Sequence, residues 1–168
     1  MMKQLLATGL PLLHTFHKWD RLFSILRDGS SFHTFLANVK KSRKTLAVIE
    51  TNEGKVFGFY AGETWKNRVG SAAFYGNGES FLWKLDEVGN VVVYKWTGGN
   101  SFFQLCDATK GQIAMGGGGG GEFGVCVDDD FMRGTSGACG TFGNEGPLSD
   151  EPCFDVINFE VYGFVGEL

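Results

Sequence analysis

Apolar runs of strand length recur through almost the whole sequence, and turn signals separate them. Nine runs can be recognised, at residues 22–27, 46–50, 55–61, 80–85, 91–96, 102–106, 112–115, 123–127 and 156–164. The turns between them include Asn52-Glu53-Gly54 and Gly89-Asn90, where glycine supplies the backbone conformations that hairpins need. The pattern therefore predicts a mainly β (α+β) fold, a two-sheet antiparallel β-sandwich flanked by a few short helices.

One segment carries convincing helical periodicity. It follows the turn at Asp28-Gly29, either Ser30 or Ser31 can cap its first turn, and it extends to about Lys41. Its apolar side chains recur at helical spacing and share one face, which we expect to point at a core; they are Phe32, Phe35, Leu36 and Val39.

The length of 168 residues fits a single domain, because one core of this size buries about two thirds of the surface of the unfolded chain. We therefore assign residues 1–168 to one domain. Residues 1–13 are leucine-rich like a short signal peptide, but no small-residue cleavage site follows and the apolar run is too short to span a bilayer. We expect instead an N-terminal helical segment over residues 1–20 that packs on the sandwich, with His14 and His17 on a solvated helical face.

The charge pattern argues against nucleic-acid binding. The net charge is −4, and the basic residues are scattered apart from one short patch formed by Lys40, Lys41, Arg43 and Lys44. Such a patch is too small to bind a phosphate backbone.

The four cysteines are Cys106, Cys126, Cys139 and Cys153. No two of them are separated by the two residues typical of a zinc knuckle or a redox dithiol. An even number would permit two disulfides in a secreted protein, but the apolar runs around them favour buried, reduced thiols.

Several motifs resemble catalytic or ligand-binding sites only superficially. The glycine run at 116–121 lacks the Lys-Ser/Thr of a phosphate-binding loop and predicts a tight turn in which at least one residue has positive φ. Residues 134–137, Gly-Thr-Ser-Gly, resemble the surroundings of a nucleophilic serine, although only His33 on the predicted helix could act as the base. The consecutive carboxylates at 128–130 lack the spacing of a calcium loop. We therefore predict no catalytic residue, no metal and no cofactor.

Glu79 stands between Gly78 and Ser80, just before a very apolar run. Its carboxylate could accept hydrogen bonds from nearby amides and organise the turn, or it could act as a general base. The first interpretation is preferred.

The order of several motifs resembles the TLDc domain, a module found in the eukaryotic oxidation-resistance proteins. The motifs are YGNGESF at 75–81, YKWTGGNSFFQLCD at 94–107, the glycine run followed by EFG and VDDDF, CGTFGN at 139–144, and FEVYGF at 159–164. The positions that match the family signature, with no individual role assigned, are Glu79, Ser80, Trp96, Asn100, Gly124, Cys139 and Asn144. Gly140 departs from the pattern, because an acidic residue is expected there in many members.

The resemblance implies a two-sheet sandwich without an accepted catalytic centre, protection against oxidative damage and, for several members, binding to the vacuolar proton-pumping ATPase. We expect a cytoplasmic, monomeric, non-enzymatic protein-interaction module without direct membrane insertion, whose partner is a protein such as the soluble sector of that pump. Segments 63–70 and 143–152 are polar and turn-rich and are expected to contribute to the interface. Two alternatives remain open, a thiol- or carboxylate-dependent enzyme acting on oxidised species and a scaffolding domain of a longer protein. Trp96 ends an apolar strand and is expected to be a buried anchor between the sheets.

Overall fold

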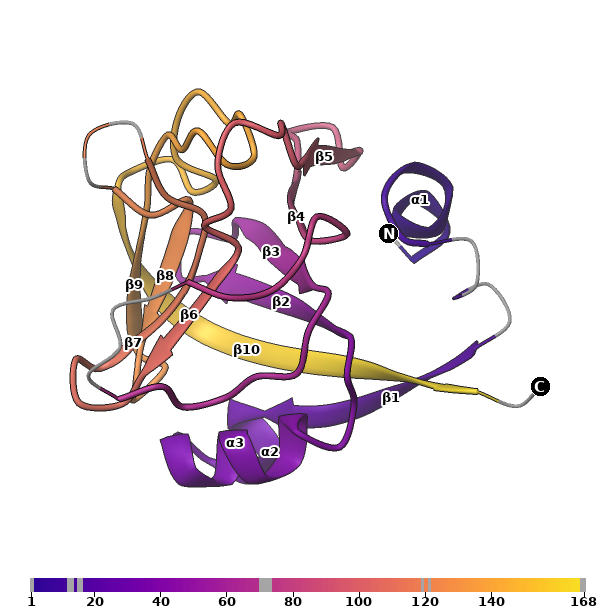
Figure 1. Cartoon of the computed structure of the whole chain (residues 1–168), viewed down its shortest axis with the longest axis vertical. Coiled ribbons are helices and arrows are strands. Elements are labelled where there is room, and N and C mark those ends of the chain that lie inside the picture. Colours follow the sequence, from indigo (N-terminus) through magenta and orange to yellow (C-terminus); the bar gives the residue numbers. More distant parts are fainter. Residues whose placement is uncertain are drawn as a thin grey trace.

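The computed structural model describes residues 2–11, 14, 17–69, 74–118, 120 and 122–166, and in these residues it is dominated by antiparallel sheet (Figure 1). The first sheet contains β1 (His17–Ser24), β2 (Thr45–Thr51), β3 (Val56–Ala61), β4 (Phe81–Leu85), β5 (Val91–Lys95) and most of β10 (Cys153–Gly166). The second contains β6 (Gln104–Asp107), β7 (Gln112–Met115), β8 (Val125–Asp128), β9 (Arg133–Ser136) and the beginning of β10.

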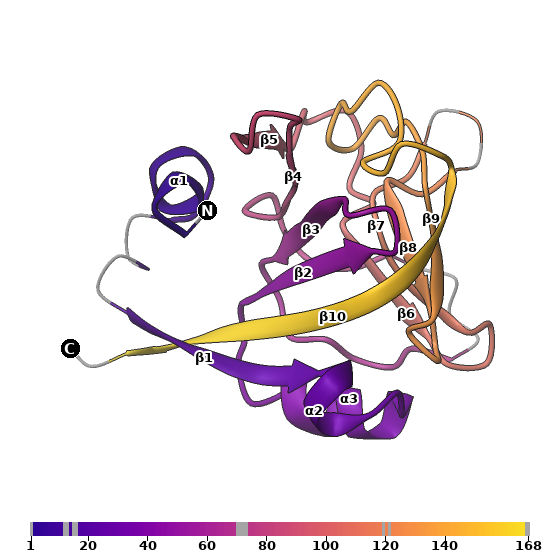
Figure 2. The ribbon, with the colours of Figure 1, turned by 180° about the vertical axis from the view of Figure 1, so that it is seen from behind.

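Strand β10 belongs to both sheets. The hydrogen-bonded order is β5-β4-β3-β2-β10-β9-β8-β7-β6, and β1 pairs with the far end of β10. Residues 153–155 pair with β9, whereas residues 156–163 pair with β2. Figure 2 shows β10 crossing the molecule from the second sheet to β1, so that one long strand joins the two layers of the predicted sandwich.

The main core lies between the two sheets. Phe59 and Ile49 enter it from the first sheet, and Ile113 and Val127 enter it from the second. A group of phenylalanines closes one end, with neighbouring ring centroids 5.1 to 6.3 Å apart; its members are Phe23, Phe35, Phe131 and Phe159. These inward-facing side chains confirm the predicted face-to-face packing.

The predicted helix is present as α3 (Phe32–Val39). The Ser31 hydroxyl accepts a hydrogen bond from the Thr34 amide at 3.3 Å, so Ser31 is the N-cap, and Phe35 and Val39 are buried. The other helices are α1 (Met2–Thr8) and α2 (Ile25–Asp28). In the part of the chain that the structure describes, none of the helices is long and apolar enough to cross a bilayer.

The N-terminal region differs from the prediction in two respects. Residues 22–27 do not form one strand, because β1 ends at Ser24 and α2 begins at Ile25. Residues 17–20 are not helical either, since they form the start of β1 and pair with the last part of β10. Long-range pairing with β10 therefore decides the conformation of residues 17–20.

Strand β9 was not predicted. Its sequence, Arg-Gly-Thr-Ser, lacks large apolar side chains, but it pairs with β8 on one side and β10 on the other. A Cβ atom at Gly134 would lie 2.4 Å from the ring of Phe154, so the glycine allows β10 to pack closely.

Candidate functional site

Four of the signature positions surround the glycine run at one end of the sandwich; we call Asn100, Gly124, Cys139 and Asn144, together with Thr141, the loop cluster. Asn100 and Thr141 hold the run in place. The Thr141 hydroxyl donates to Asn100 Oδ1 at 2.6 Å and accepts from the Gly117 amide at 3.0 Å. Asn100 Nδ2 donates to the Gly117 carbonyl at 3.3 Å. Three separate chain segments are thereby joined around one glycine.

The glycine run adopts conformations that other residues rarely adopt. Gly116, Gly118 and Gly120 have φ values of 80°, 75° and 106°, which confirms the predicted need for positive φ. Gly119 lies outside the described residues. Gly140 stands where the family pattern has an acidic residue. Its amide N–H donates to the Gly117 carbonyl at 3.1 Å, so Gly140 also lies against the glycine run.

Cys139 and Asn144 form a buried pair beneath the loops. The Cys139 thiol donates to Asn144 Oδ1 at 2.9 Å, and Asn144 Nδ2 donates to the carbonyls of Gly137 and Gly146 at 2.8 and 2.9 Å. Burial raises the pKa of the Cys139 thiol, which keeps it protonated and able to donate. Gly124 permits this packing, because a Cβ there would lie 3.0 Å from Cys139 Sγ.

We expect Asn144→Ala to lower the free energy of unfolding by about 2 kcal/mol or more, because it leaves two carbonyls and one thiol without their partner in a buried site. Urea unfolding followed by circular dichroism measures this loss. Asn90→Ala, in an exposed turn, is the matched control and should change stability by less than about 0.5 kcal/mol. Equal stability of the two variants would contradict the structural role of Asn144.

Glu79 and Ser80 lie in a second group, on the loop before β4. The Ser80 hydroxyl is buried and accepts from the Gly62 amide at 3.1 Å. The turn is organised by Asn77, whose Oδ1 accepts from the Glu79 amide at 3.1 Å. The predicted amide contacts of the Glu79 carboxylate are not what the structure shows, because this carboxylate forms an ion pair with Lys44 at 2.7 Å and is about half exposed. The Glu79 carboxylate therefore pairs with the Lys44 cation, and the Asn77 side chain accepts the amide hydrogen bond of the turn.

The prediction for Trp96 is wrong, since its side chain is 41% exposed and does not lie between the sheets. Trp96 follows β5, at the edge of the first sheet. Its ring covers Gly78, where a Cβ would lie 2.3 Å from the ring, and its indole N–H donates to the Asn100 carbonyl at 2.7 Å. Trp96 therefore connects the Glu79 loop with the loop cluster.

The prediction for His14 is also wrong, because this side chain is only 2% exposed and does not lie on a solvated helical face. It shares hydrogen bonds with the Tyr60 hydroxyl at 2.8 Å and with His17 Nδ1 at 2.9 Å, and its ring stacks on Phe164 with centroids 3.8 Å apart. His17 lies in β1. Burial, together with the nearby His17 and Lys44, lowers the pKa of His14 to about 4. Nothing in the local sequence indicated the contacts with Tyr60 and Phe164, which come from β3 and β10.

The groups considered for catalysis have structural partners or lie in turns. The Ser136 hydroxyl donates to the Gly124 carbonyl at 2.6 Å and accepts from the Leu148 amide at 2.8 Å, so it is part of the packing around the loop cluster. His33 lies on α3 beside Leu36 and Trp65. Residues 128–130 end β8 and enter a turn. Among the described residues, no three His, Cys, Asp or Glu side chains are grouped so that they could hold a metal ion.

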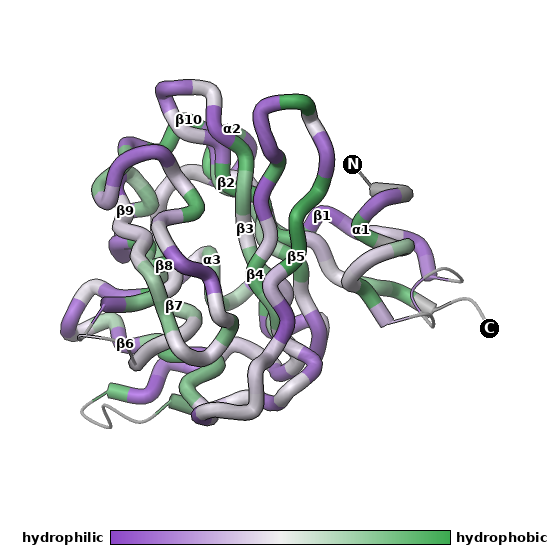
Figure 3. The backbone as a smooth tube through the Cα atoms, turned by 90° about the horizontal axis from the view of Figure 1, so that it is seen from above, coloured by the Kyte–Doolittle hydropathy of each residue, from purple (hydrophilic) through white to green (hydrophobic). Residues whose placement is uncertain are grey.

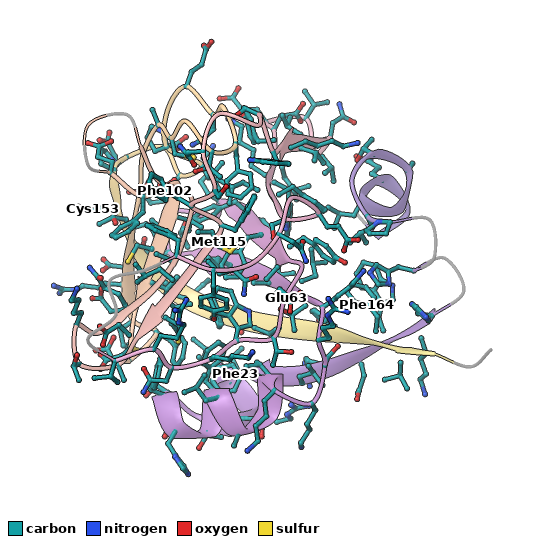
Figure 4. All side chains as sticks on the ribbon, viewed as in Figure 1. Phe23, Glu63, Phe102, Met115, Cys153 and Phe164 are labelled. Carbon is teal, nitrogen blue, oxygen red and sulfur yellow. The ribbon has the colours of Figure 1, made fainter. Side chains whose placement is uncertain are left out.

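Three of the cysteines are buried as predicted, but Cys153 is not, because it alternates with Phe154 on β10 and points to the outside. Burial raises the pKa of Cys106 and of Cys126 to about 12. Cys153 borders an open groove of about 410 Å³ whose lining includes Arg133 and Asp155. Figure 4 shows Cys153 at the side of the molecule opposite Phe164.

Comparison with known proteins identifies the family. The family model of the TLDc domain matches residues 1–165. Oxidation resistance protein 1 of Yarrowia lipolytica is 34% identical over 158 residues, covering 90% of this chain and 66% of the yeast protein. Nuclear receptor coactivator 7 of Mus musculus is 35% identical over 160 residues, covering 95% of this chain but 16% of the mouse protein. The chain thus corresponds to about two thirds of the first relative and to a small part of the second. Because the family model spans nearly all of its residues, the chain belongs to the TLDc domain family.

Proposed function

We propose that this chain is a non-enzymatic protein-binding module that acts in protection against oxidative damage, in the cytosol, by binding the soluble sector of the vacuolar proton-pumping ATPase. Its similarity to proteins named oxidation resistance protein 1 supports the first part. The TLDc resemblance supports the second, because several members of the family bind this pump.

The proposal rests on what the signature side chains do in the structure. Asn100, Cys139 and Asn144 make hydrogen bonds that fix the backbone of neighbouring loops, and the thiol among them is buried and protonated. These three side chains therefore shape a surface, and their hydrogen-bonding groups are already engaged in holding the loops. Rigidly held loops on a sandwich are a common means of binding another protein.

The loop after the cluster, residues 143–152, is the best candidate for the contact surface. Asn144 and Leu148 anchor it inside the protein, while Glu145 and Glu151 are exposed.

The other expected segment begins at Glu63 and contains Trp65, which is buried and donates to Thr45 Oγ1 at 3.1 Å. Figures 1 and 2 place residues 63–69 far from the 143–152 loop along the long axis, so one flat interface would not cover both. Gly70 lies outside the described residues.

The proposal can be tested by mixing the purified chain with the soluble pump sector of its own organism and measuring co-elution and the ATPase rate. We expect binding, and we expect Glu145→Lys with Glu151→Lys to weaken it at least about tenfold, a loss of about 1.4 kcal/mol. Glu87→Lys, in the exposed turn between β4 and β5, is the control and should bind like the parent. Absence of both co-elution and any rate change for the parent chain would refute pump binding.

The alternative of a thiol-dependent enzyme is best represented by Cys153, because this thiol alone among the four is exposed and it borders a groove. We expect a thiol reagent at neutral pH to modify one cysteine per folded chain at the rate of an ordinary exposed thiol, and four after denaturation. Cys153→Ser should remove the native signal. A reaction much faster than that of a small thiol such as glutathione would favour the enzyme.

A further inference from the structure

The outer face of the first sheet carries a second apolar cluster, separate from the main core. Its buried members come from β2, β3 and β4 and from the N-terminal residues; they are Leu5, Leu10, Leu46, Tyr60, Phe81 and Trp83. The helix α1 and the residues up to Pro11, which we call the N-terminal arm, cover this face beside β5 (Figures 1 and 3). The sheet residues beneath the arm are here called the arm face: Leu46, Tyr60, Phe81, Trp83, Val91 and Val93.

The second apolar cluster is larger than the arm face. Apolar side chains that are only partly buried pack against it across the sheet from β5 to β1; they are Trp19, Val48, Val56, Leu85, Val91, Val93 and Phe164. Figure 3 shows strongly hydrophobic residues along β5, the strand that α1 contacts. A helix of seven residues is about 10 Å long and spans only two strands. Among the described residues, partly exposed apolar side chains therefore lie beside α1 as well as beneath it.

Among the described residues of the arm, two buried leucines and one hydrogen bond to the sheet hold it in place. Leu5 is fully buried and Leu10 is 6% exposed, both against the arm face. The Gln4 side-chain oxygen accepts from the Val91 amide at 2.7 Å. At the other end of the arm, Gly9 and Pro11 border an open cleft of about 290 Å³ whose opposite wall includes Glu79 and Trp96. The boundary between arm and sheet is thus open to solvent on this side.

Trp83 shows that the arm is an incomplete partner for this face. Its side chain is fully buried, yet its indole N–H has no hydrogen-bond partner among the described residues. A buried donor without a partner destabilises the state that contains it. A helix from another protein that brought a carbonyl or hydroxyl oxygen to the Trp83 N–H would supply the hydrogen bond that the arm does not. Such a helix could therefore bind this face more tightly than the arm does.

We propose that the arm face is a docking surface for a leucine-bearing amphipathic helix of a partner protein, and that the N-terminal arm is its resident competitor. The arm itself indicates the chemistry of the occupant, a short helix with leucines placed as Leu5 and Leu10 are and a hydrogen-bond acceptor over Trp83. This surface is distinct from the 143–152 loop, so failure of pump binding through that loop leaves the inference intact.

The inference can be tested with the full chain and a fluorescent peptide of residues 2–11 as the probe. A Cβ at Gly9 would lie 3.2 Å from Val93 Cγ2 and 2.9 Å from Phe81 Cζ. Gly9→Cys with Val93→Cys, in a Cys153→Ser background, therefore brings two thiols within reach of a disulfide that can lock the arm, at the cost of a small shift of the Phe81 ring. We expect the reduced chain to bind the peptide saturably, the oxidised chain to bind it at least about tenfold more weakly, and reductant to restore binding. Equal binding by both forms, or no binding by the reduced form, would overturn the inference.

Two further measurements check the assignment independently of the lock. Leu5→Asp should free the arm face and strengthen peptide binding, whereas Ala7→Asp, at an exposed position of α1, should not. A peptide carrying Asp at the positions of Leu5 and Leu10 should not bind to the reduced chain. The Leu5→Asp chain could instead form dimers that dissociate when the peptide is added. In that case the occupant is a second copy of this chain, and the partner-helix assignment is wrong.

Discussion

Replacing Phe159 by alanine is expected to lower the free energy of unfolding by about 3–5 kcal/mol. Phe159 is fully buried in β10, and its ring meets those of Phe23, Phe35 and Phe131 with centroids 5.2 to 6.3 Å apart. These rings come from distant parts of the chain, so the cavity cannot close without moving β1 and α3 together. Urea unfolding, followed by tryptophan fluorescence and by circular dichroism, should give the loss as a lower midpoint with an unchanged slope.

The control for this variant lies two residues away on the same strand. Ile157 is 48% exposed, and Ile157→Ala should cost less than about 1 kcal/mol, because it loses little burial and leaves no enclosed cavity. A loss below about 1.5 kcal/mol for Phe159→Ala would mean that the sheets can repack around the missing ring, contrary to the close packing described above.

Acidification is expected to destabilise the fold through His14. Its pKa falls from 6.5 to about 4 on folding, so the folded state favours the neutral ring. The contribution of neutral His14 to the free energy of unfolding is fully present above pH 6.5 and is lost progressively as the pH falls towards 4. The loss is about 1.4 kcal/mol per pH unit and about 3 kcal/mol in total. Unfolding free energies measured at intervals from pH 7 to pH 4 test this.

The groups that face His14 come from several elements: Tyr60 from β3, His17 from β1, Phe164 from β10, and Lys44 and Glu79 from neighbouring loops. His14→Gln can still bond to Tyr60 but cannot take up a proton in this range, so its stability should depend less on pH than that of the parent chain. His33→Gln, at an exposed position of α3, should keep the parent profile. Parallel profiles for the parent and His14→Gln would show that other groups cause the acid sensitivity.

The parts of the fold that could be predicted are those in which local chemistry and tertiary packing agree. Helix α3 has its cap at Ser31 and its apolar stripe in sequence, and the β2–β3 turn has a glycine at positive φ at Gly54. The family signature named Asn100, Cys139 and Asn144 without assigning them a role, and the structure brings these three residues close to the glycine run or its neighbours.

The parts that could not be predicted depend on distant partners. Strand β9 is polar and exists because β8 and β10 supply its hydrogen bonds, and residues 17–20 are extended because they pair with β10. His14 is buried by Tyr60 and Phe164, which lie 46 and 150 positions further along the chain. Trp96 is predicted to be buried because it ends an apolar strand, but β5 is an edge strand and the Trp96 ring, although it meets Phe103, remains 41% exposed.

The sharing of β10 between the two sheets has a consequence for how the chain folds. Residues 153–166 pair with β1, β2 and β9, so neither sheet is complete until this strand has been added. Such pairings have a high contact order, which is typical of domains that fold in milliseconds to seconds. During synthesis the apolar strands β2 to β5 must leave the ribosome well before β10 does, and they remain prone to aggregation until it arrives. We therefore expect the two sheets to form their complete hydrogen-bonded order only after β10 has been synthesised, and the earlier strands to need protection from aggregation until then.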